Sequence, residues 1–577
     1  MRRAVRLLET VRRLRASQVG HRLVRRLDRR PPRAGAGLAS FTGAAALPPA
    51  SRRPLAPPYD RPTPLGWSFA GAEAVPGAGG LAWDAGVSPS LLQRFHAAYA
   101  EPVRATAERG DLAAARRWLA ALADGPDHPY VRSRRVLSLV EARLQGLVEA
   151  DPVLVADAAA LVRRPEWDVR GNHLVANGAA LVRFGGAFGG SLARRAAARG
   201  ASILATCARE QVLADGVHHE RSPVYHGLVL EHFLVALETW AARGEAPAPG
   251  VEGAVRAMAE ALGELVLPDG ALARFRDGAP GVALPVEALR AWAWDRAGPL
   301  RAVRAGSRTF AAAGLGVAVA TDGRTTATLV AAPPCPRDLP AHGHADALAY
   351  EAVLDGVRVV AAAGTAAYGQ GTARDRDRRP GAFAGFEVDG RAPADPYGAF
   401  RLGARAGVRH LDAHDVDGWS TVAAAVSGVP GVHGRFAWRR TVAAGPGGVL
   451  VVVDETLGTG THEATCFLPL LPGLEVRVED AGALVTGLGR VWRLACPGAR
   501  VDVEVGTFAL AFGATVPRSV LRIRRALEGP ARGLHAWTSG AERVQLRCDA
   551  RPGCELRVEL RRASGTTVGW LRAGPGP

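Results

Sequence analysis

The sequence predicts a multidomain α+β protein, in which an N-terminal (α/α) helical toroid is followed by a large antiparallel β-sandwich. Two observations predict this fold class. Between residues 85 and 303 apolar residues recur at spacings of three and four, as on one face of a helix. After about residue 304 the period changes to two, and turn pairs such as Asp322-Gly323 and Asp355-Gly356 separate the runs. We therefore expect a lead-in over 1–84, a toroid over 85–303 and a sandwich over 304–577.

Composition sets the broad class of the protein. The 577 residues carry a net charge of +17 with 22% charged and 48% hydrophobic residues, which indicates a globular chain rather than a disordered one. No run reaches the roughly 18 apolar residues that span a bilayer. All basic residues are Arg, and Asn occurs only at Asn172 and Asn177. The Arg bias is typical of a GC-rich coding background, so the lack of Lys says little about function.

Much of the positive charge lies at the N-terminus. Residues 1–33 hold twelve Arg against two acidic residues, and Val5, Leu8, Val11 and Leu14 recur at helical spacing. This pattern predicts a basic amphipathic helix. Such a helix could lie on an anionic membrane or touch a polyanion, or it could be a solvated arm that packs its apolar stripe on the body. Residues 34–84 are rich in Pro, Gly and Ala, which predicts a mostly irregular lead-in.

The N-terminus is a poor signal peptide, because charged residues interrupt every apolar run that could follow the basic start. We expect a cytoplasmic location or one peripheral to the inner membrane, with a periplasmic location as the alternative. The six Cys show no metal-ligand spacing. Cys548 and Cys554 flank a turn and could pair if oxidised, but in a reducing compartment they would be ordinary buried thiols, which we favour.

Helices are expected over 111–124, 131–149, 152–163, 172–184, 190–214, 223–243, 251–267 and 285–296. Their short connections favour antiparallel hairpins and hence a helical array or toroid. Strands are expected from Thr309 to Thr321, Thr325 to Ala332, Tyr350 to Ala362, Gly448 to Asp454, Arg500 to Phe512 and Glu555 to Arg561.

Two polar segments fall in the helical part. The first contains Asn172, His173 and Asn177, and a helix from about residue 172 would place His173 and Asn177 on one face. Asn172 could instead be a simple N-cap. In the second, Ser222-Pro223 predicts a helix start, which places Tyr225 in the first turn next to Glu220 and His226. The positive helix end would favour a phenolate and help Tyr225 act as a base or acid. The alternative is a solvated polar loop.

Two further segments fall in the β part. In His342-Gly343-His344-Ala345-Asp346, a strand would place His342, His344 and Asp346 on one face. A His-x-His pair on a strand is a common metal-ligand arrangement and also suits a general base with a helper, whereas the alternative is a polar strand edge. The segment from Phe383 to Arg391 predicts a strand and turn without a chemical signal of its own.

In this order the segments resemble the heparinase II/III-like family of polysaccharide lyases. The matching motifs are Gly171-Asn172-His173-Leu174, Glu220-Arg221-Ser222-Pro223-x-Tyr225-His226, His342-x-His344-Ala345-Asp346-Ala347-Leu348 and Val388-Asp389-Gly390-Arg391. The resemblance implies a helical toroid followed by a β-sandwich. It also implies β-elimination of uronic-acid glycans, such as glycosaminoglycans, without an organic cofactor.

Roles follow from the resemblance, motif by motif. Asn172 and His173 would neutralise the substrate carboxylate, so that charge from the C5 position can spread into it. Tyr225 would be the acid that protonates the leaving oxygen, and it could also be the base. His342 would be a second acid/base or a carboxylate contact. We assign supporting contacts with the substrate to four residues: Glu220, His226, His344 and Asn177.

The sequence departs from the resemblance at the zinc site that many relatives carry. Their second His corresponds to His344. Their Asp-Pro-Gly-Thr turn reads Ala362-Ala363-Gly364-Thr365 here, and their later His is replaced near Phe383. Because Zn²⁺ normally takes about four ligands, we expect no metal at this position.

Three functional hypotheses follow. The first is a polysaccharide lyase acting on an acidic glycan. The second, motivated by the missing metal ligands, is a glycan-binding or surface-polysaccharide assembly protein of the same fold with weakened catalysis. The third is nucleic-acid binding by the Arg-rich N-terminus, which we set aside because residues 1–33 contain no Phe, Tyr or Trp and no nucleic-acid motif follows.

Overall fold

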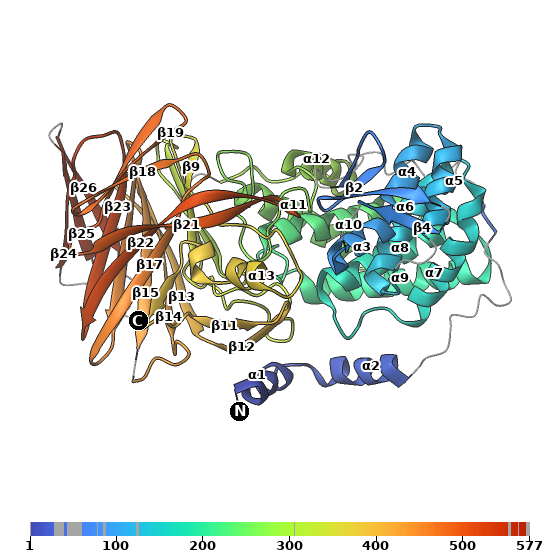
Figure 1. Cartoon of the computed structure of the whole chain (residues 1–577), viewed down its shortest axis with the longest axis horizontal. Coiled ribbons are helices and arrows are strands. Elements are labelled where there is room, and N and C mark those ends of the chain that lie inside the picture. The colour runs from blue at the N-terminus through green and yellow to red at the C-terminus, as the bar shows by residue number, and fades with distance from the viewer. Residues whose placement is uncertain are drawn as a thin grey trace.

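A computed structural model describes residues 2–27, 40–42, 60–77, 79–84, 88–122, 126–304, 306–434, 436–551, 555–562 and 565–572. A helical part and a β part lie side by side, and two N-terminal helices run along one edge beneath both (Figure 1). The order of a helical region followed by antiparallel sheets confirms the predicted fold class. No helix of the described residues is long and apolar enough to cross a bilayer.

All eight predicted helices of the helical part form, and the periodic apolar residues become its core. N-cap residues fix the start of several helices. For example, the side chains of Ser90 and Asp111 accept backbone N–H groups in the first turn of the helices that follow them. α10 is apolar on all sides and is buried along nearly its whole length. The helices are α3 (Leu91–Ala98), α4 (Glu101–Glu108), α5 (Leu112–Ala121), α6 (Pro129–Leu144), α7 (Asp151–Arg163), α8 (Gly171–Ala187), α9 (Gly190–Gln211), α10 (Pro223–Ala242), α11 (Val251–Leu265) and α12 (Val286–Ala297).

The lead-in is less irregular than predicted. Residues 60–83 form a four-stranded antiparallel sheet of β1 (Asp60–Pro62), β2 (Trp67–Phe69), β3 (Ala72–Gly77) and β4 (Gly80–Trp83). Its strands are too short for the period of two to stand out among Pro and Gly. What stabilises them is burial, because Trp67 and Phe69 are 1% and 0% exposed within the helical core. The expectation of a largely irregular 34–84 is therefore wrong for this stretch.

The β part contains three large antiparallel sheets. The five-stranded sheet runs through β5 (Arg308–Phe310), β6 (Leu315–Val319), β7 (Thr325–Val330), β8 (Tyr350–Leu354) and β9 (Val357–Val360). The four-stranded sheet has the order β10 (Phe386–Val388), β17 (Thr461–Pro469), β22 (Ala514–Glu528) and β21 (Arg500–Ala511). The eight-stranded sheet has the order β13 (Gly407–Val416), β14 (Trp419–Ser427), β15 (Ala437–Gly445), β16 (Val449–Leu457), β23 (Ala531–Ser539), β20 (Arg490–Ala495), β19 (Gly482–Gly487) and β18 (Glu475–Glu479).

One apolar core joins these three sheets on one side of the eight-stranded sheet. On its other side lies a three-stranded sheet of β24 (Gln545–Arg551), β25 (Glu555–Arg562) and β26 (Gly565–Arg572), packed around Trp419 and Val451. Two segments predicted as single strands are hairpins, because the chain turns at Gly314 between β5 and β6 and at Asp355-Gly356 between β8 and β9. A further hairpin of β11 (Ala394–Tyr397) and β12 (Arg401–Arg405) and the short helix α13 (Thr372–Asp377) face the helical part (Figure 1).

The two parts share a small apolar core. Leu265 and Phe275, from the helical side, pack with Phe310, Val353 and Phe383 of the β side, and all five are at most 2% exposed. Burial of apolar area of this kind stabilises by about 25 cal/mol per Å². It fixes the loops between the two parts, which hold the polar segments described next.

The N-terminal arm, residues 2–27, differs from the prediction in two ways. It forms two helices, α1 (Arg2–Val11) and α2 (Ala16–Leu27), rather than one. Its apolar stripe does not pack on the body, because Leu8 and Leu23 are 65% and 54% exposed while Gln18 is buried. The interpretation of a solvated arm packing its apolar residues inward is therefore wrong, because the contacts with the body are polar.

Of the six cysteines, Cys207, Cys335, Cys466 and Cys496 are free and buried, and Cys548 is free and half-buried. Cys554, the partner considered for Cys548, lies outside the described residues.

Candidate functional site

Asn172 lies in the first turn of α8, where it is bound to a buried glutamate. Its backbone N–H donates to Oε1 of Glu220 at 2.7 Å, and its Nδ2 lies 3.1 and 3.2 Å from the two carboxylate oxygens. The residue before it must be glycine, since a Cβ on Gly171 would lie 2.2 Å from Glu220 Oε1 at a φ of +56°. Asn172 is therefore not an N-cap: its amide is held and oriented by Glu220.

Tyr225 lies in the first turn of α10, as predicted, and Ser222 caps this helix by accepting the Tyr225 N–H. Its phenol hydrogen-bonds the phenol of Tyr368, which lies between β9 and α13. Burial, and then the neighbouring Tyr368 and Asp277, raise the pKa of Tyr225 well above its usual range. Burial therefore favours the neutral phenol over the phenolate expected from the helix end, so Tyr225 carries its proton in the resting protein.

His342 and His344 do not lie on a strand, which corrects the prediction for this segment. β8 begins only at Tyr350, and the backbone before it turns through Leu348 at a φ of +60°. This backbone bonds Arg378 rather than a neighbouring strand: Ala345 N–H donates to the Arg378 carbonyl, and the Arg378 guanidinium donates to the Gly343 carbonyl at 2.8 Å. The two imidazoles nevertheless converge on one carboxylate.

That carboxylate is Asp277, which is fully buried between α11 and α12. It accepts His342 Nδ1 at 2.8 Å on Oδ2, His344 Nε2 at 2.6 Å on Oδ1, the Thr365 hydroxyl at 3.0 Å and the guanidinium of Arg374 on both oxygens. Burial alone would raise the pKa of Asp277, but Arg374 and the two imidazoles hold it well below its usual range. His344 is kept neutral, since burial lowers its pKa to about 4.

Four residues meet at one point of the site and are called the central residues below: Asn172, Glu220, Tyr225 and His342. The ring of His342 lies 4.2 Å from the ring of Tyr225, centroid to centroid. Its Nε2 lies 3.4 Å from Asn172 Nδ2 and 3.6 Å from Glu220 Oε2. Since Nδ1–H is given to Asp277, Nε2 carries a lone pair and can accept a proton. The structure thus brings Asn172, Glu220, Tyr225 and His342 together from segments about 50 and 120 residues apart.

Comparisons with known proteins identify the family of this chain. Residues 155–293 match the family model "Heparinase II/III N-terminus", and residues 303–568 match "Heparinase II/III-like, C-terminal". The chain belongs to this family. Its fold is similar to a solved heparinase III, with a TM-score of 0.69 at 16% identity over 86% of both chains. It is also similar to the heparan sulfate lyase HepC from Pedobacter heparinus, with a TM-score of 0.60 at 17% identity over 97% of this chain and 94% of that one. None of the curated proteins matches the sequence.

The zinc site that the family resemblance implies does not fit these residues. The turn that would supply a carboxylate holds Ala362 and Ala363, both buried. Phe383, at the place of the later His, packs its ring 5.1 Å from the ring of His344. The Nε2 of His344 is instead hydrogen-bonded to Asp277 Oδ1. A single imidazole cannot hold Zn²⁺, so no step is assigned to a metal here.

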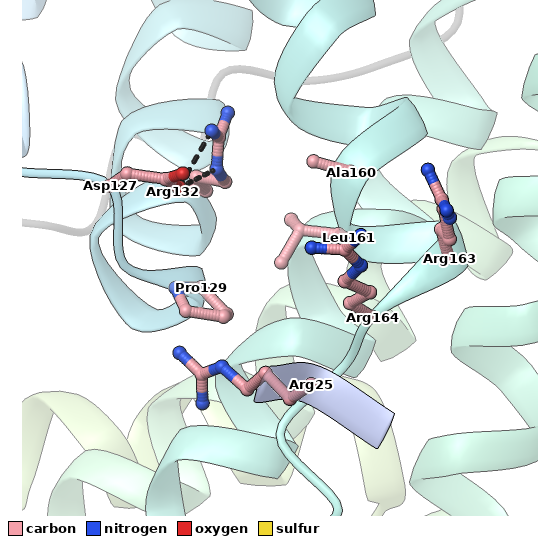
Figure 2. Close-up of a pocket in the computed structure, with 8 residues that line it drawn as sticks. All are labelled: Arg25, Asp127, Pro129, Arg132, Ala160, Leu161, Arg163 and Arg164. Carbon is pink, nitrogen blue, oxygen red and sulfur yellow. Dashed lines mark hydrogen bonds and ion pairs between the residues drawn. The ribbon is translucent and has the colours of Figure 1, made fainter. Parts of the chain in front are cut away.

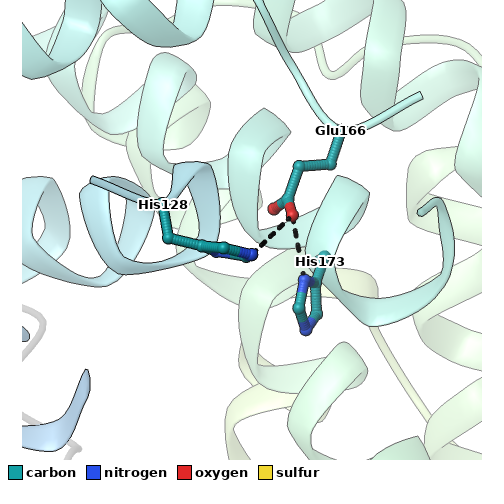
Figure 3. Close-up of side chains that lie close together, drawn as sticks. All are labelled: His128, Glu166 and His173. Atoms are coloured by element: carbon teal, nitrogen blue, oxygen red, sulfur yellow. Dashed lines mark hydrogen bonds and ion pairs between the residues drawn. The ribbon is translucent and has the colours of Figure 1, made fainter. Parts of the chain in front are cut away.

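His173 belongs to a neighbouring cluster rather than to the four central residues. Its Nδ1 donates to Oε1 of the buried Glu166 at 3.2 Å, and its ring stacks on Tyr130 at 4.3 Å. His128 reaches the same Glu166 oxygen at 3.6 Å (Figure 3). Burial would lower the pKa of His173, but Glu166 outweighs it and the pKa is raised. The pKa of His128 is lowered to about 4 by burial.

Two side-chain groups in the described part of the chain bring possible metal ligands within 4.8 Å of one another: His128, Glu166 and His173, and His218, His219 and Glu220. In the first, His128 Nδ1 already accepts the Tyr130 N–H at 3.2 Å, so a neutral His128 carries its proton on Nε2. The Nε2 lone pair that a metal needs is therefore absent. In the second, Glu220 is committed to Asn172.

Asn177 and His226 are structural in this fold. Asn177 is 0% exposed and connects Ser133 Oγ, at 2.8 Å, with the Glu166 backbone N–H, also at 2.8 Å. His226 is 0% exposed, accepts the His218 N–H at 3.1 Å and contacts the Met258 carbonyl at 2.8 Å. Neither side chain faces a surface that a substrate could reach. The expected shared face of His173 and Asn177 exists, but it points at Glu166.

A cationic pocket of about 220 Å³ lies near the His173 cluster and has none of the four central residues in its wall (Figure 2). Pro129 and Leu161 form apolar parts of its wall. Four arginines and one aspartate supply the charge, namely Arg25, Arg132, Arg163, Arg164 and Asp127. Arg25 belongs to the N-terminal arm and adds to the electrostatic environment of both His128 and His173.

Sequence reasoning missed Asp277, Tyr368 and Arg374. Asp277 had one usable signal, since Arg276-Asp277 is a charged pair between Phe275 and Gly278 in an apolar stretch. Both residues of the pair adopt left-handed φ angles, of +56° and +63°, an unusual conformation that proteins retain mainly at functional sites. Tyr368 and Arg374 lie on either side of the Gly-rich stretch Gly369-Gln370-Gly371 and carry no periodic signal.

Proposed function

We propose that the protein is a polysaccharide lyase that cleaves an acidic, uronic-acid-containing glycan by β-elimination. The observation that carries the proposal is the convergence of an oriented amide, an imidazole whose Nε2 carries a lone pair and a neutral phenol at Asn172, His342 and Tyr225. These are an anion-binding donor, a base and an acid, the three groups that this elimination needs.

In the proposed reaction the substrate carboxylate takes the Asn172 N–H that lies near His342 in the resting protein. Glu220 keeps the other amide N–H and so holds the orientation. His342 Nε2, freed of that contact, removes the C5 proton. The C5–H electron pair forms the C4=C5 double bond, the C4–O bond breaks, and its electrons go to the leaving oxygen. Tyr225 donates its phenolic proton to that oxygen.

One feature outside the central residues supports an acidic substrate. The arginine pocket suits a further sulfate or carboxylate of the same chain, because guanidinium groups bind such anions in bidentate geometry. Glycosaminoglycans carry these groups on most of their sugars.

The test is an assay of the purified protein against a panel of uronate glycans, following the ultraviolet absorbance of the new double bond. Tyr225→Phe should lower kcat by about a hundredfold or more with little change in KM. Tyr350→Phe is the matched control, since it removes a buried phenol that bonds His535 in the β part. Full activity of Tyr225→Phe, or no product from any glycan, would contradict the proposal.

A second candidate is a glycan-binding or assembly protein of the same fold that has lost turnover. The replacement of two zinc ligands by Ala362 and Phe383 favours it. It predicts binding of acidic glycans that Asn172→Ala and added salt both weaken, with no unsaturated product. The same panel therefore separates the two candidates.

A further inference from the structure

The N-terminal arm is docked on the body by its polar side. In α1, Arg6 forms a two-point ion pair with Asp395 at 2.6 and 2.7 Å, and the Thr10 hydroxyl contacts Tyr397 and the Leu402 carbonyl. In α2, the side chain of Gln18 is buried against the body, and Arg25 pairs with Asp168. The inward side of both helices is thus made of hydrogen bonds and charges.

The outward side carries the apolar residues. Their spacings of three and four place them on one stripe of each helix, opposite the docked side. In a stable amphipathic helix this stripe faces the core, and here it faces solvent. The exposed side chains are Val5 55%, Leu7 49%, Leu8 65%, Val11 46%, Val19 40%, Leu23 54%, Val24 60% and Leu27 82%. Exposed apolar residues gathered in this way mark an interaction surface.

Charge and shape indicate which kind of partner this apolar stripe binds. Arginines accompany it on both helices, among them Arg12, at 57% side-chain exposure, and the exposed Arg26. Residues 1–33 contain twelve Arg and two acidic residues, so the covering surface should be negative. The two helices lie end to end along one edge of the molecule (Figure 1), which suits a flat surface better than a groove. Apolar side chains among arginines are the composition of helices that lie in a membrane interface.

We propose that the arm binds an anionic lipid surface, with the exposed stripe of α1 and α2 inserted among the headgroups. Burial of a Leu or Val side chain contributes about 1.5–3 kcal/mol, and each nearby arginine about 1 kcal/mol on an anionic leaflet. Because the docked side forms its own ion pairs and hydrogen bonds with the body, the arm can bind lipid without leaving the body.

The inner side of the arm connects this surface to the candidate site. Gln18 Nε2 lies 3.3 Å from the Asp168 carbonyl and 3.3 Å from the Asp338 carbonyl. Asp168 precedes Asn172 by four residues and Asp338 precedes His342 by four. One amide therefore joins the segments that carry two of the central residues. Lipid binding would hold the protein with this site beside the membrane.

The experiment is vesicle flotation of the full-length protein, which does not depend on lyase activity. Vesicles of phosphatidylcholine alone are compared with vesicles that also contain phosphatidylglycerol. We expect binding only to the anionic vesicles, weakened by salt. The double variant Leu8→Glu/Leu23→Glu should bind at least tenfold more weakly. Val505→Glu is the control, because Val505 is 83% exposed on β21 and lies outside the arm.

Three outcomes would overturn the proposal: no binding of the wild type, equal binding of the double variant, or a dimer in solution that the double variant dissolves. A gain-of-signal variant guards against loss of folding. Leu8→Trp should shift its fluorescence to the blue on anionic vesicles and not on neutral ones, and an unshifted spectrum would also contradict insertion.

Discussion

His342 donates its Nδ1–H to Oδ2 of Asp277 at 2.8 Å, so that the tautomer of the candidate base is set by a buried carboxylate. The same carboxylate accepts His344, Thr365 and Arg374. Where the family resemblance implies zinc near this loop, this chain has an Arg–Asp ion pair with two imidazoles attached. The pair orients His342 directly, which a metal bound only to His344 would not do.

Removing this charge should cost stability and acid resistance. The depressed pKa of Asp277 contributes stability above its unfolded pKa of about 3.9, and that stability is lost as the pH falls through the folded value. Asp277→Asn should lower the free energy of unfolding by about 3–5 kcal/mol at neutral pH, because Arg374 is left buried and unpaired. Urea unfolding at several pH values measures both effects. Asp389→Asn is the control. Because the Asp389 side chain is 43% exposed, this change should alter the free energy of unfolding by less than about 1 kcal/mol.

Gly171 should not tolerate a side chain. Gly171→Ala places a methyl group 2.2 Å from Glu220 Oε1 at a left-handed φ, so Glu220 and Asn172 must move. We expect a loss of about 2–4 kcal/mol in stability and loss of activity. Gly323→Ala is the matched control, with a φ of +70° and no atom within 4 Å. If both variants lose the same stability in thermal unfolding, contact with Glu220 is not the cause.

The arginine pocket should matter for long substrates only. Arg163→Gln/Arg164→Gln should raise KM for long acidic oligosaccharides by about tenfold and leave kcat unchanged, because two charge-assisted contacts are weakened away from the reacting bond. Short oligosaccharides that do not reach the pocket should be unaffected. Arg117→Gln, at an exposed arginine on α5, is the control. An equal rise of KM for short and long substrates would contradict the prediction that the pocket binds a sugar away from the cleaved bond.

The His173–Glu166 pair predicts a pH dependence of stability. A raised folded pKa means that the contribution of His173 is complete below its unfolded pKa of about 6.5 and is lost as the pH rises through the folded value. His173→Gln should therefore flatten the decline of stability above about pH 6.5. His433→Gln, at an exposed histidine, should leave the profile as in the wild type. An unchanged slope in His173→Gln would show that Glu166 does not hold a charged imidazole.

Gln18 should act as a positioning residue. Gln18→Glu keeps the shape but replaces the donor that faces the Asp168 and Asp338 carbonyls with an acceptor. We expect kcat to fall by about tenfold or more through misplacement of Asn172 and His342, with a smaller effect on KM. Gln145→Glu, exposed after α6, is the control. A change in Tm without any change in kcat would reduce the role of Gln18 to stability.

The sequence by itself determined the order of the fold and the start of the chemistry. The periods of three to four and of two are local properties of the chain, and so are the Ser222-Pro223 helix start and the placement of Tyr225 in the first turn. The motifs around Asn172, Tyr225 and His342 were also visible, because polar residues are rare in their apolar surroundings.

Only the tertiary structure decided which polar residues meet and in which protonation state. Asp277 contacts residues about 65 to 97 positions away, a distance along the chain at which no periodicity carries information. Tertiary contacts then reversed two local expectations. Burial made Tyr225 a neutral phenol in spite of the helix end. The apolar stripe of the arm stays exposed because Gln18 and Arg25 bind the body from the other side of α2. Desolvation and long-range pairing depend on what the whole chain places around a group, so neither can be read from neighbouring residues.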